Sequence, residues 1–307
     1  MIVARSQSAL ARVERREAVE LQRLRDALAG RPRGRRLSRL CDTAAIAALT
    51  PRRQVSIVIP SAGTLDEFGA ALVEGTLELV AGLATTYVVV TNGNLTPEGR
   101  EACDRYGARI VEVSSDGFNF SRAINAGVAA TSTRMVLLLN DDVRGPVAAA
   151  HWLPRWLARM SRLSCVALQW PDRRTAYGGI NWNAPGHMPA HQFLGAPPES
   201  LPPEPATLAV TGAAMLVDRR LFEQLGGFCE DLPLNYNDID FCVQALRHGT
   251  CARQFNDIVL THKESASRGS TPPTVTDYRV FAERCADTLA QHGVAISADD
   301  AIATAGL

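Results

Sequence analysis

The sequence lacks the features that would place the protein in a membrane or in a secretory pathway. No apolar run approaches the roughly 18 residues needed to cross a bilayer, and no charged segment followed by an apolar core opens the chain. The seven cysteines are scattered, and no Cys-x-x-Cys pair indicates zinc binding or redox chemistry. We therefore expect a cytoplasmic protein whose cysteines are reduced and mostly buried.

The net charge of zero hides an uneven distribution. Residues 1–53 contain 13 Arg and 5 acidic residues, a net +8, so residues 54–307 carry −8. Within the first 50 residues, apolar side chains recur near one helical face at Leu10, Val13, Leu21, Leu24 and Leu28. We expect residues 1–50 to be an Arg-rich amphipathic helical extension. It would pack on the protein body or on a second copy in a homodimer, or dock peripherally on the inner face of the membrane. The lack of Trp and Phe on its apolar face favours protein contact.

The Arg-rich tract "RPRGRR" at residues 31–36 does not indicate a nucleic-acid partner. No aromatic side chains that could stack on bases accompany it, and the remainder of the chain is net acidic. A solvated linker accounts for it.

Strands and helices alternate from residue 54 onward. Short apolar runs indicate strands at "QVSIVIP", "TYVVVT", "ARIVEVSS" and "RMVLLL", the first three rich in β-branched residues. Helices are expected at 65–82 and 120–132. After residue 146 the pattern weakens: a helix near 147–160, a strand at 165–170, a Gly- and Pro-rich stretch to residue 205, then a strand, two helices and a strand ending at His262. This order predicts an α/β fold with a mostly parallel, nucleotide-binding type of sheet and helices on both faces.

Two adjacent carboxylates follow a buried strand at Asn140-Asp141-Asp142. They repel each other and lose hydration, so something must compensate them. An exposed turn closed by Gly145 is one alternative. A divalent cation at the carboxyl end of the strand, where open α/β sheets bind their ligands, is the other. The motif alone does not decide between them.

Two further polar clusters stand at the ends of predicted elements: 237–240, "NDID", opens a helix, and 262–268, "HKESASR", follows a strand. In this order the clusters resemble the family 2 glycosyltransferases with a GT-A fold, particularly the bacterial branch that builds O-antigen, rhamnan and other cell-surface glycans. The resemblance covers about 54–270. It rests on the segments "VSIVIPSAG", "FNFSRAINAGVAA", "LLLNDDV", "VTGAAMLVDRRLFEQLGGF", "YNDIDFCVQALRHG" and "THKESASRG".

The resemblance implies a metal-dependent, inverting enzyme with a nucleoside-diphosphate sugar as donor and a glycan or lipid-linked glycan as acceptor. It divides the chain into a nucleotide-binding half, 54–146, an acceptor-binding half, 147–270, and a C-terminal helical tail, 271–307. A divalent cation, Mn²⁺ or Mg²⁺, would neutralise the charge that develops on the leaving diphosphate.

Specific residues take roles from the same resemblance. The family's Asp-x-Asp motif falls on 140–142, which makes Asp142 the principal metal ligand and places Asp141 near the ribose or the metal. Asn140 replaces the first Asp, and the lost charge should weaken metal binding. His262 matches the histidine that completes the metal or diphosphate site. Asp238 matches the catalytic base that takes the proton of the acceptor hydroxyl, although Asp238 or Asn237 could equally be an N-cap.

Asp240 lies about 200° around the helix from Asp238, so we expect it to support the structure or to bind Arg247. At the nucleotide this chain departs from the family's pattern, because the family usually closes its second strand with Asp-Asn-Gly-Ser where this chain reads "TNGN" at 91–94. The resemblance places four residues around the nucleotide: Pro60, Ser61, Asp116 and Asn125. Arg268 would reach the diphosphate from a loop over 264–275 that closes on the donor. Asp116 could equally be a turn residue, and Asn125 a polar contact inside a helix.

Other functions fit the sequence less well. His187 and His191 have the spacing of a helical metal pair, but the prolines around them make a helix improbable. A sugar nucleotidyltransferase usually begins with a Gly-rich loop containing Arg, whereas this chain offers "PSAGTLDEF". A non-catalytic glycan-binding relative stays open, because Asn140, Thr91 and Asn237 stand where acids are usual.

Overall fold

The computed structural model describes residues 55–113, 117–145, 152–183, 188–263, 273–294 and 296. The Arg-rich helix expected over residues 1–50, Asp116, His187 and the segment with Arg268 lie outside the described residues. Among the described helices, none is long and apolar enough to cross a membrane.

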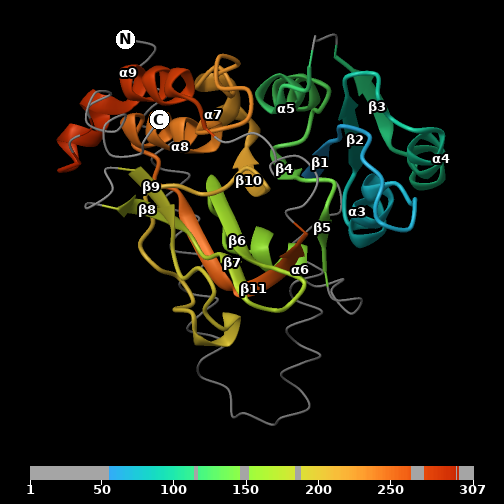
Figure 1. Cartoon of the computed structure of the whole chain (residues 1–307), viewed down its shortest axis with the longest axis horizontal. Helices are drawn as coiled ribbons and strands as arrows, with labels where there is room; N and C mark the ends of the chain where they lie inside the picture. Colours follow the sequence, from blue (N-terminus) through green and yellow to red (C-terminus); the bar gives the residue numbers. More distant parts are fainter. Residues whose placement is uncertain are drawn as a thin grey trace, which may run out of the picture. The chain divides into compact units, whose positions relative to one another are not determined.

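A mixed sheet forms the centre of the described chain (Figure 1). Its nine described strands run in the order β3-β2-β1-β4-β10-β6-β11-β5, with β7 paired to β6. Their bounds are β1 Val55–Pro60, β2 Thr86–Thr91, β3 Arg109–Glu112, β4 Met135–Leu139, β5 Val143–Arg144, β6 Leu163–Gln169, β7 Thr175–Tyr177, β10 Ala214–Asp218 and β11 Arg253–His262. The strands β1 to β4 are mutually parallel, as the alternation of strands and helices predicts.

Three of the described strands, β5, β7 and β10, depart from the parallel pattern, and β10 is the one in the interior of the sheet. It lies between β4 and β6 and runs antiparallel to both, with Leu139 paired to Ala214 and Cys165 paired to Met215. Its first residue, not its last, therefore lies beside the end of β4. This reversal brings the loop before β10 to the edge of the sheet where β4 and β11 end.

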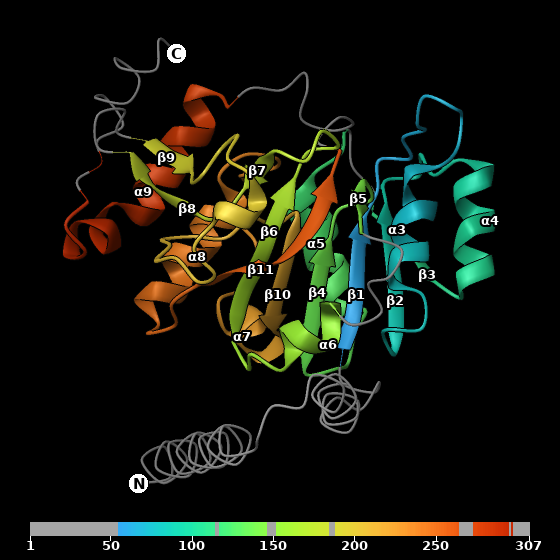
Figure 2. The same ribbon diagram turned by 90° about the horizontal axis from the view of Figure 1, so that it is seen from below.

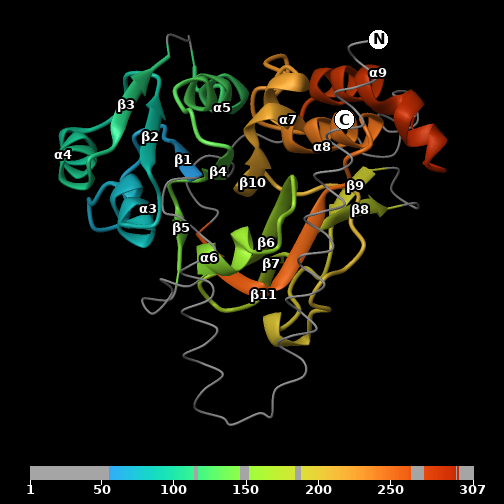
Figure 3. The same cartoon turned by 180° about the vertical axis from the view of Figure 1, so that it is seen from behind.

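Helices cover both faces of the sheet. Their bounds are α3 Leu72–Val80, α4 Pro97–Tyr106, α5 Phe120–Ala129, α6 Trp152–Leu157, α7 Arg219–Gln224, α8 Asn237–Arg247 and α9 Val275–Gln291. Figures 1 and 3 show α5, α7, α8 and α9 together on one side, with α3 and α6 on the other. Figure 2 shows the strands between these layers. The arrangement confirms the expected α/β class.

Helix α4 is absent from the sequence-based expectation, although its boundary signals are present. The Thr96 hydroxyl accepts a hydrogen bond from the Gly99 amide at 3.2 Å, Pro97 takes the first helical position, and Gly107 ends the helix with φ 65°. Helix α3 begins at Leu72 and not at residue 65. The preceding loop is held by Asp66, whose carboxylate accepts from the amides of Phe68 and Ala70, both at 2.9 Å.

The Gly- and Pro-rich stretch contains more regular structure than its composition indicates. After β7 it forms a hairpin of β8, Ile180–Asn183, and β9, Met188–His191, followed by the short 3₁₀ helix η2, Pro198–Ser200. The hairpin stays short because Gly and Pro interrupt it on both sides. It carries His191 to the same region as the ends of β4 and β11.

The C-terminal helix α9 is part of the same hydrophobic core as the sheet. Thr274 and Asp277 form a capping box at its start. Tyr278, Phe281, Cys285 and Leu289 are each at most 1% exposed and belong to the core cluster. The tail helix is therefore packed onto α8 and is integral to the described fold.

Candidate active site

The predicted polar clusters meet at one cavity. Its walls include Asn140 and Asp142 after β4, Asp238 in the first turn of α8, and His262 at the end of β11. The cavity measures about 60 Å³, much less than the several hundred Å³ of a pocket that encloses a whole drug-sized ligand. Its size matches a reaction centre, not the whole binding site of a nucleotide sugar.

Asp142 and His262 form a close polar contact at the cavity. Nε2 of His262 lies 2.9 Å from Oδ1 of Asp142, and the two side chains are 12% and 5% exposed. The backbone reinforces the pairing, because the Lys263 amide donates to the Asp142 carbonyl at 3.2 Å. Burial of Asp142 excludes the exposed turn as an explanation of the paired carboxylates.

Asn140 completes this group with an oxygen that lacks a partner. Its Nδ2 lies 3.4 Å from Nε2 of His262, and its Oδ1 is buried without a hydrogen-bond partner among the described residues. Buried oxygens are normally satisfied. A carboxylate, an imidazole and an orphan amide oxygen in one place are a donor set that a divalent cation such as Mn²⁺ fits.

The described residues contain no group of three or more His, Cys, Asp or Glu placed to hold a metal. A cation here would therefore depend on Asp142 and His262, with Asn140 as a neutral third donor. Remaining positions would fall to water or to ligand oxygens, as is usual for hard cations. Because Asn140 replaces an Asp, the site has one negative charge less than the family's motif would give it.

Asp141 points to a different neighbour. Its Oδ2 accepts a hydrogen bond from the Ser61 hydroxyl at 2.6 Å, which joins the ends of β1 and β4. Burial is the main cause that raises the pKa of Asp141 from its ordinary 3.8 to about 7; the adjacent Asp142 raises it further, whereas Ser61 and Arg144 lower it. Ser61 thus lies at the predicted edge of the sheet, next to Pro60, the last residue of β1.

The loop that carries the carboxylates is held by residues that the sequence analysis missed. Nη1 of Arg144 donates to the carbonyls of Asp141 and Val143 at 3.0 and 2.9 Å. The Thr76 hydroxyl, in α3, contacts the same carbonyls. Gly75 makes room for this arginine, since a Cβ there would lie 2.4 Å from its Nε. Only the position of Arg144 directly after the acidic motif could have signalled this role.

Asp238 is fixed by backbone donors. Its Oδ2 accepts from the Gly212 amide and its Oδ1 from the Ile239 amide, both at 2.9 Å, and the residue is 4% exposed. Gly212 belongs to the loop before β10, so the antiparallel direction of that strand supplies one of the two donors. The N-cap of α8 is Tyr236, which corrects the alternative that Asn237 or Asp238 caps the helix.

Asp240 has a different partner from the one expected. Its carboxylate accepts from Nε and Nη2 of Arg284 in α9, at 2.8 and 3.0 Å, and not from Arg247. The expectation of a structural role holds, but the partner comes from a helix that is distant in sequence.

Asn125 does not line this cavity, and its predicted place near the nucleotide stays a prediction. Its Oδ1 accepts from the Phe228 amide at 2.8 Å, and its Nδ2 donates to the Phe228 carbonyl at 2.9 Å and to Glu230 at 3.1 Å. The side chain therefore joins α5 to the loop after α7. Thr91 and Asn92, at the end of β2, each have a buried side-chain oxygen without a hydrogen-bond partner among the described residues.

His191 lines the cavity, which the sequence analysis missed because its spacing to His187 indicated only an improbable zinc pair. Its Nδ1 lies 3.2 Å from the Ala176 carbonyl, and its ring contacts Tyr177 edge-on at 5.3 Å. Phe118, Phe120 and Leu234 add apolar surface to the cavity walls. No composition or spacing signal in the Gly- and Pro-rich stretch identified this histidine.

Comparison with known proteins supports the fold. A crystal structure of GalNAc-T7 with UDP, GalNAc and Mn²⁺ matches 75% of this chain and 48% of its own, with a TM-score of 0.56 at 11% sequence identity. This chain has a GT-A fold. No family model matches the chain.

Two curated proteins have similar sequences. "Uncharacterized protein y4gI" of Sinorhizobium fredii is 32% identical over 240 residues, and "O-antigen biosynthesis protein RfbC" of Myxococcus xanthus is 26% identical over 250 residues. These matches cover 70% and 75% of this GT-A chain. The chain spans only 25% and 18% of the length of the two relatives.

The raised pKa of Asp141 predicts a pH-dependent effect on stability. The folded metal-free protein binds this proton more tightly than the unfolded chain does, so it loses stability as pH rises from about 3.8 to about 7. Asp141→Asn removes this loss and retains an acceptor for Ser61. With a chelator present, we expect its Tm at pH 8 to exceed that of the parent by about 2–4 °C, the shift for roughly 1 kcal/mol. At pH 3.5 the gain should vanish. Asp104→Asn, an exposed change on α4, is the control, and an equal gain at both pH values would contradict the assignment.

The contacts of Asn125 predict a loss of stability without a loss of ligand binding. Asn125→Ala removes hydrogen bonds to Phe228 and leaves its backbone groups unsatisfied, so the free energy of unfolding should fall by about 1–3 kcal/mol. Chemical denaturation measures this change. Nucleotide affinity, measured by calorimetry, should stay within about twofold of the parent. A selective loss of nucleotide affinity at unchanged stability would instead support the predicted role at the nucleotide.

Proposed function

We propose that the protein is an inverting, metal-dependent glycosyltransferase that moves a sugar from a nucleoside-diphosphate sugar to a glycan or lipid-linked glycan acceptor. The main support is the meeting of Asp142, His262 and Asp238 at one cavity on a GT-A fold. Binding of UDP and Mn²⁺ by the structural relative GalNAc-T7 is consistent with this donor class and cation. The O-antigen relative supports a role in bacterial surface polysaccharide synthesis.

Asp142 and His262 would hold the cation, with Asn140 beside them. When bound, Mn²⁺ or Mg²⁺ would supply the positive charge that stabilises the diphosphate leaving group. Asp142 is kept in place from both sides, by His262 and by the Lys263 amide. Thr76 and Arg144 limit its movement further, because they bind the backbone carbonyls on either side of Asp142. This rigidity is what a site needs if it is to favour the charge of the transition state.

Asp238 is the proposed base. It takes the proton of the acceptor hydroxyl as that oxygen bonds to the anomeric carbon, and the bond from this carbon to the diphosphate breaks on the opposite side. The configuration at the anomeric carbon inverts as a result. The hydrogen bonds from the Gly212 and Ile239 amides orient both of its oxygens at the cavity wall.

The donor nucleotide would lie along the ends of β1 and β2. Pro60 and Ser61 close β1, and the unsatisfied oxygens of Thr91 and Asn92 are available to a base or ribose. Asp141, joined to Ser61, would contact the ribose or the metal. Asp116 and Arg268 retain their proposed places at the nucleotide and the diphosphate.

A non-catalytic glycan-binding protein is the second candidate. It is favoured by the neutral Asn140 and by the small number of metal-binding side chains among the described residues. Turnover separates the two functions. Release of a nucleoside diphosphate from one member of a donor panel, dependent on Mn²⁺ and abolished by a chelator, supports the transferase, whereas donor binding without release supports the alternative.

Two substitutions separate the base from the metal site. Asp238→Asn keeps the shape of the side chain but removes the proton acceptor, so transfer should fall by about 10² to 10⁴-fold while donor affinity stays within about twofold. Asp142→Ala should lower metal-dependent donor binding and transfer together. Asp104→Asn should change neither. Near-normal transfer by Asp238→Asn would remove it as the base, and undiminished turnover by Asp142→Ala would remove the metal site.

His191 is proposed to contact the acceptor, because the β8–β9 hairpin carries it to the cavity that holds Asp238. His191→Ala should raise the acceptor KM by about tenfold, the cost of roughly 1.4 kcal/mol, with donor KM unchanged. His248→Ala, at the C-terminal end of α8, is the matched control. If His191→Ala changed donor KM and left acceptor KM alone, the hairpin would lie on the donor side.

A further inference from the structure

Helix α9 contacts residues 235–244, which we call the catalytic segment. The contacts run from Asn235 at one end of this segment to Gln244 at the other. Near its start, Nδ2 of Asn235 lies 3.4 Å from Oδ2 of Asp277. Further along, Gln244 donates to the Arg284 carbonyl at 3.2 Å. Figures 1 and 3 show α8 and α9 side by side. The segment contains Asp238, so contacts from α9 bear directly on the position of the proposed base.

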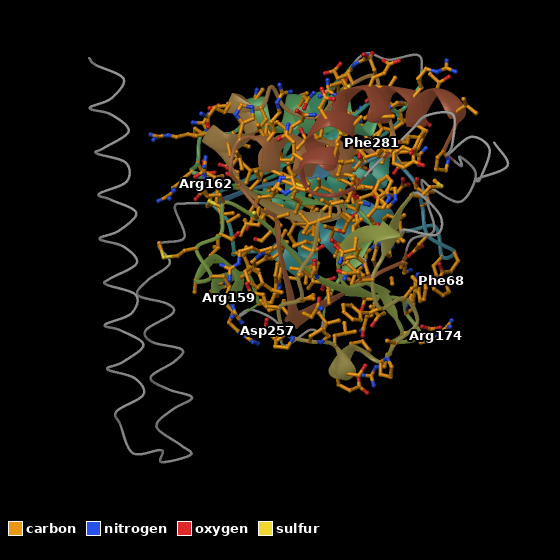
Figure 4. The ribbon with its side chains drawn as sticks, turned by 90° about the vertical axis from the view of Figure 1, so that its left-hand side faces the viewer. Phe68, Arg159, Arg162, Arg174, Asp257 and Phe281 are labelled. Atoms are coloured by element: carbon orange, nitrogen blue, oxygen red, sulfur yellow. The ribbon has the colours of Figure 1, made fainter. Side chains whose placement is uncertain are left out.

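Tyr236 has an unusual backbone conformation immediately before the base. Its φ of 59° and ψ of −4° place it in the left-handed region, which residues with a side chain rarely adopt. Such a conformation persists only where the surroundings impose it. The surroundings here are aromatic rings of α9: Phe281 stacks on Tyr236 at 5.2 Å and 20°, and Tyr278 meets it edge-on at 5.8 Å. Figure 4 shows Phe281 among the helices on this side of the sheet.

Asp240 provides the second attachment. Its carboxylate is 1% exposed and receives two hydrogen bonds from Arg284, while Sγ of Cys285 lies 3.4 Å from its Oδ1. Two parallel bonds from a planar guanidinium fix direction as well as distance. Asp240 lies in the same helical turn as Asp238, so α9 holds this turn on the side facing away from the cavity.

We propose that α9 is the positioning element for Asp238, with Phe281 and Arg284 as positioning residues. Phe281 keeps Tyr236 in the left-handed conformation at which α8 begins, and Arg284 fixes the rotation of the first turn through Asp240. Together they aim Asp238 at the cavity and at the Gly212 amide. The consequence for catalysis rests on the proposed transferase function, but the structural effect on residues 235–244 does not.

Hydrogen exchange read by mass spectrometry tests the structural effect without turnover. Arg284→Ala leaves Asp240 as a buried carboxylate without its cationic partner, so the first turn of α8 should open more often. We expect amide exchange in peptides covering 235–244 to rise at least tenfold, with peptides of β1 and β4 unchanged. Arg284→Lys retains the charge but loses the two-bond geometry, so it should give an intermediate increase.

Transfer kinetics test the effect on the base. In a protein with transferase activity, Arg284→Ala should lower kcat by about 10 to 100-fold, because a displacement of about 1 Å at a catalytic group has an effect of that size. Donor KM and Mn²⁺ affinity should stay within about twofold. Arg284→Lys should recover part of kcat, as expected of a positioning residue.

Two control variants separate positioning from general destabilisation. Arg279→Ala removes an exposed arginine from the same helix and should change neither exchange nor kcat. Leu289→Ala creates a cavity at the far end of α9 and should lower Tm while sparing kcat at a temperature well below the transition. If Leu289→Ala lowered kcat as much as Arg284→Ala at equal loss of Tm, the proposal would be overturned. Unchanged exchange at 235–244 in Arg284→Ala would also overturn it, whether or not the parent has transferase activity.

Discussion

The close contact between His262 and Asp142 is the one on which the candidate site depends, because it joins the ends of two strands that are far apart in sequence. β4 lies in the first half of the domain, whereas β11 is its last described strand. The Asp142 carboxylate contacts the imidazole of His262, and its backbone carbonyl accepts from the Lys263 amide. Without this contact, Asp142 would be a buried carboxylate next to the like charge of Asp141. The contact thus links the geometry of the sheet to the electrostatics of the cavity.

Much of the fold could be predicted from local pattern. The runs of β1, β2 and β4 are mostly apolar because both faces are covered, and this pattern does not depend on distant residues. Helix α4 was also predictable, since Thr96, Pro97 and Gly107 are ordinary boundary signals. The direction of β10 was not, because an isolated strand has the same alternation in either direction and only its neighbours in the sheet decide.

The site shows the same division between local and distant information. Asp142, Asp238 and His262 were recognised because each stands in a short motif with a familiar order. Arg284 and His191 were not, since only tertiary packing brings Arg284 to Asp240 and His191 to the cavity. Arg144 was missed although it stands two residues after Asp142, because the motif gives no sign that this side chain binds the carbonyls of its own loop. Arg247 was the plausible partner of Asp240 because both stand on α8. The sequence gives no sign that α9 packs there and supplies Arg284 in its place. For Asn125 the sequence left two alternatives, because a polar residue inside a helix can face a ligand or a neighbouring loop, and its described contacts are with the loop after α7.

The central place of β10 has a consequence for the order in which the protein is built. β6 and β11 reach the parallel half of the sheet only through β10, which pairs with β4 on one side and β6 on the other. During synthesis, the edge of β4, a row of unpaired backbone N–H and C=O groups, therefore stays uncovered until residue 218 has left the ribosome. Pairing between strands so distant in sequence is slow, and an uncovered edge favours aggregation. Nascent chains truncated before β10 are for this reason the species most in need of a chaperone.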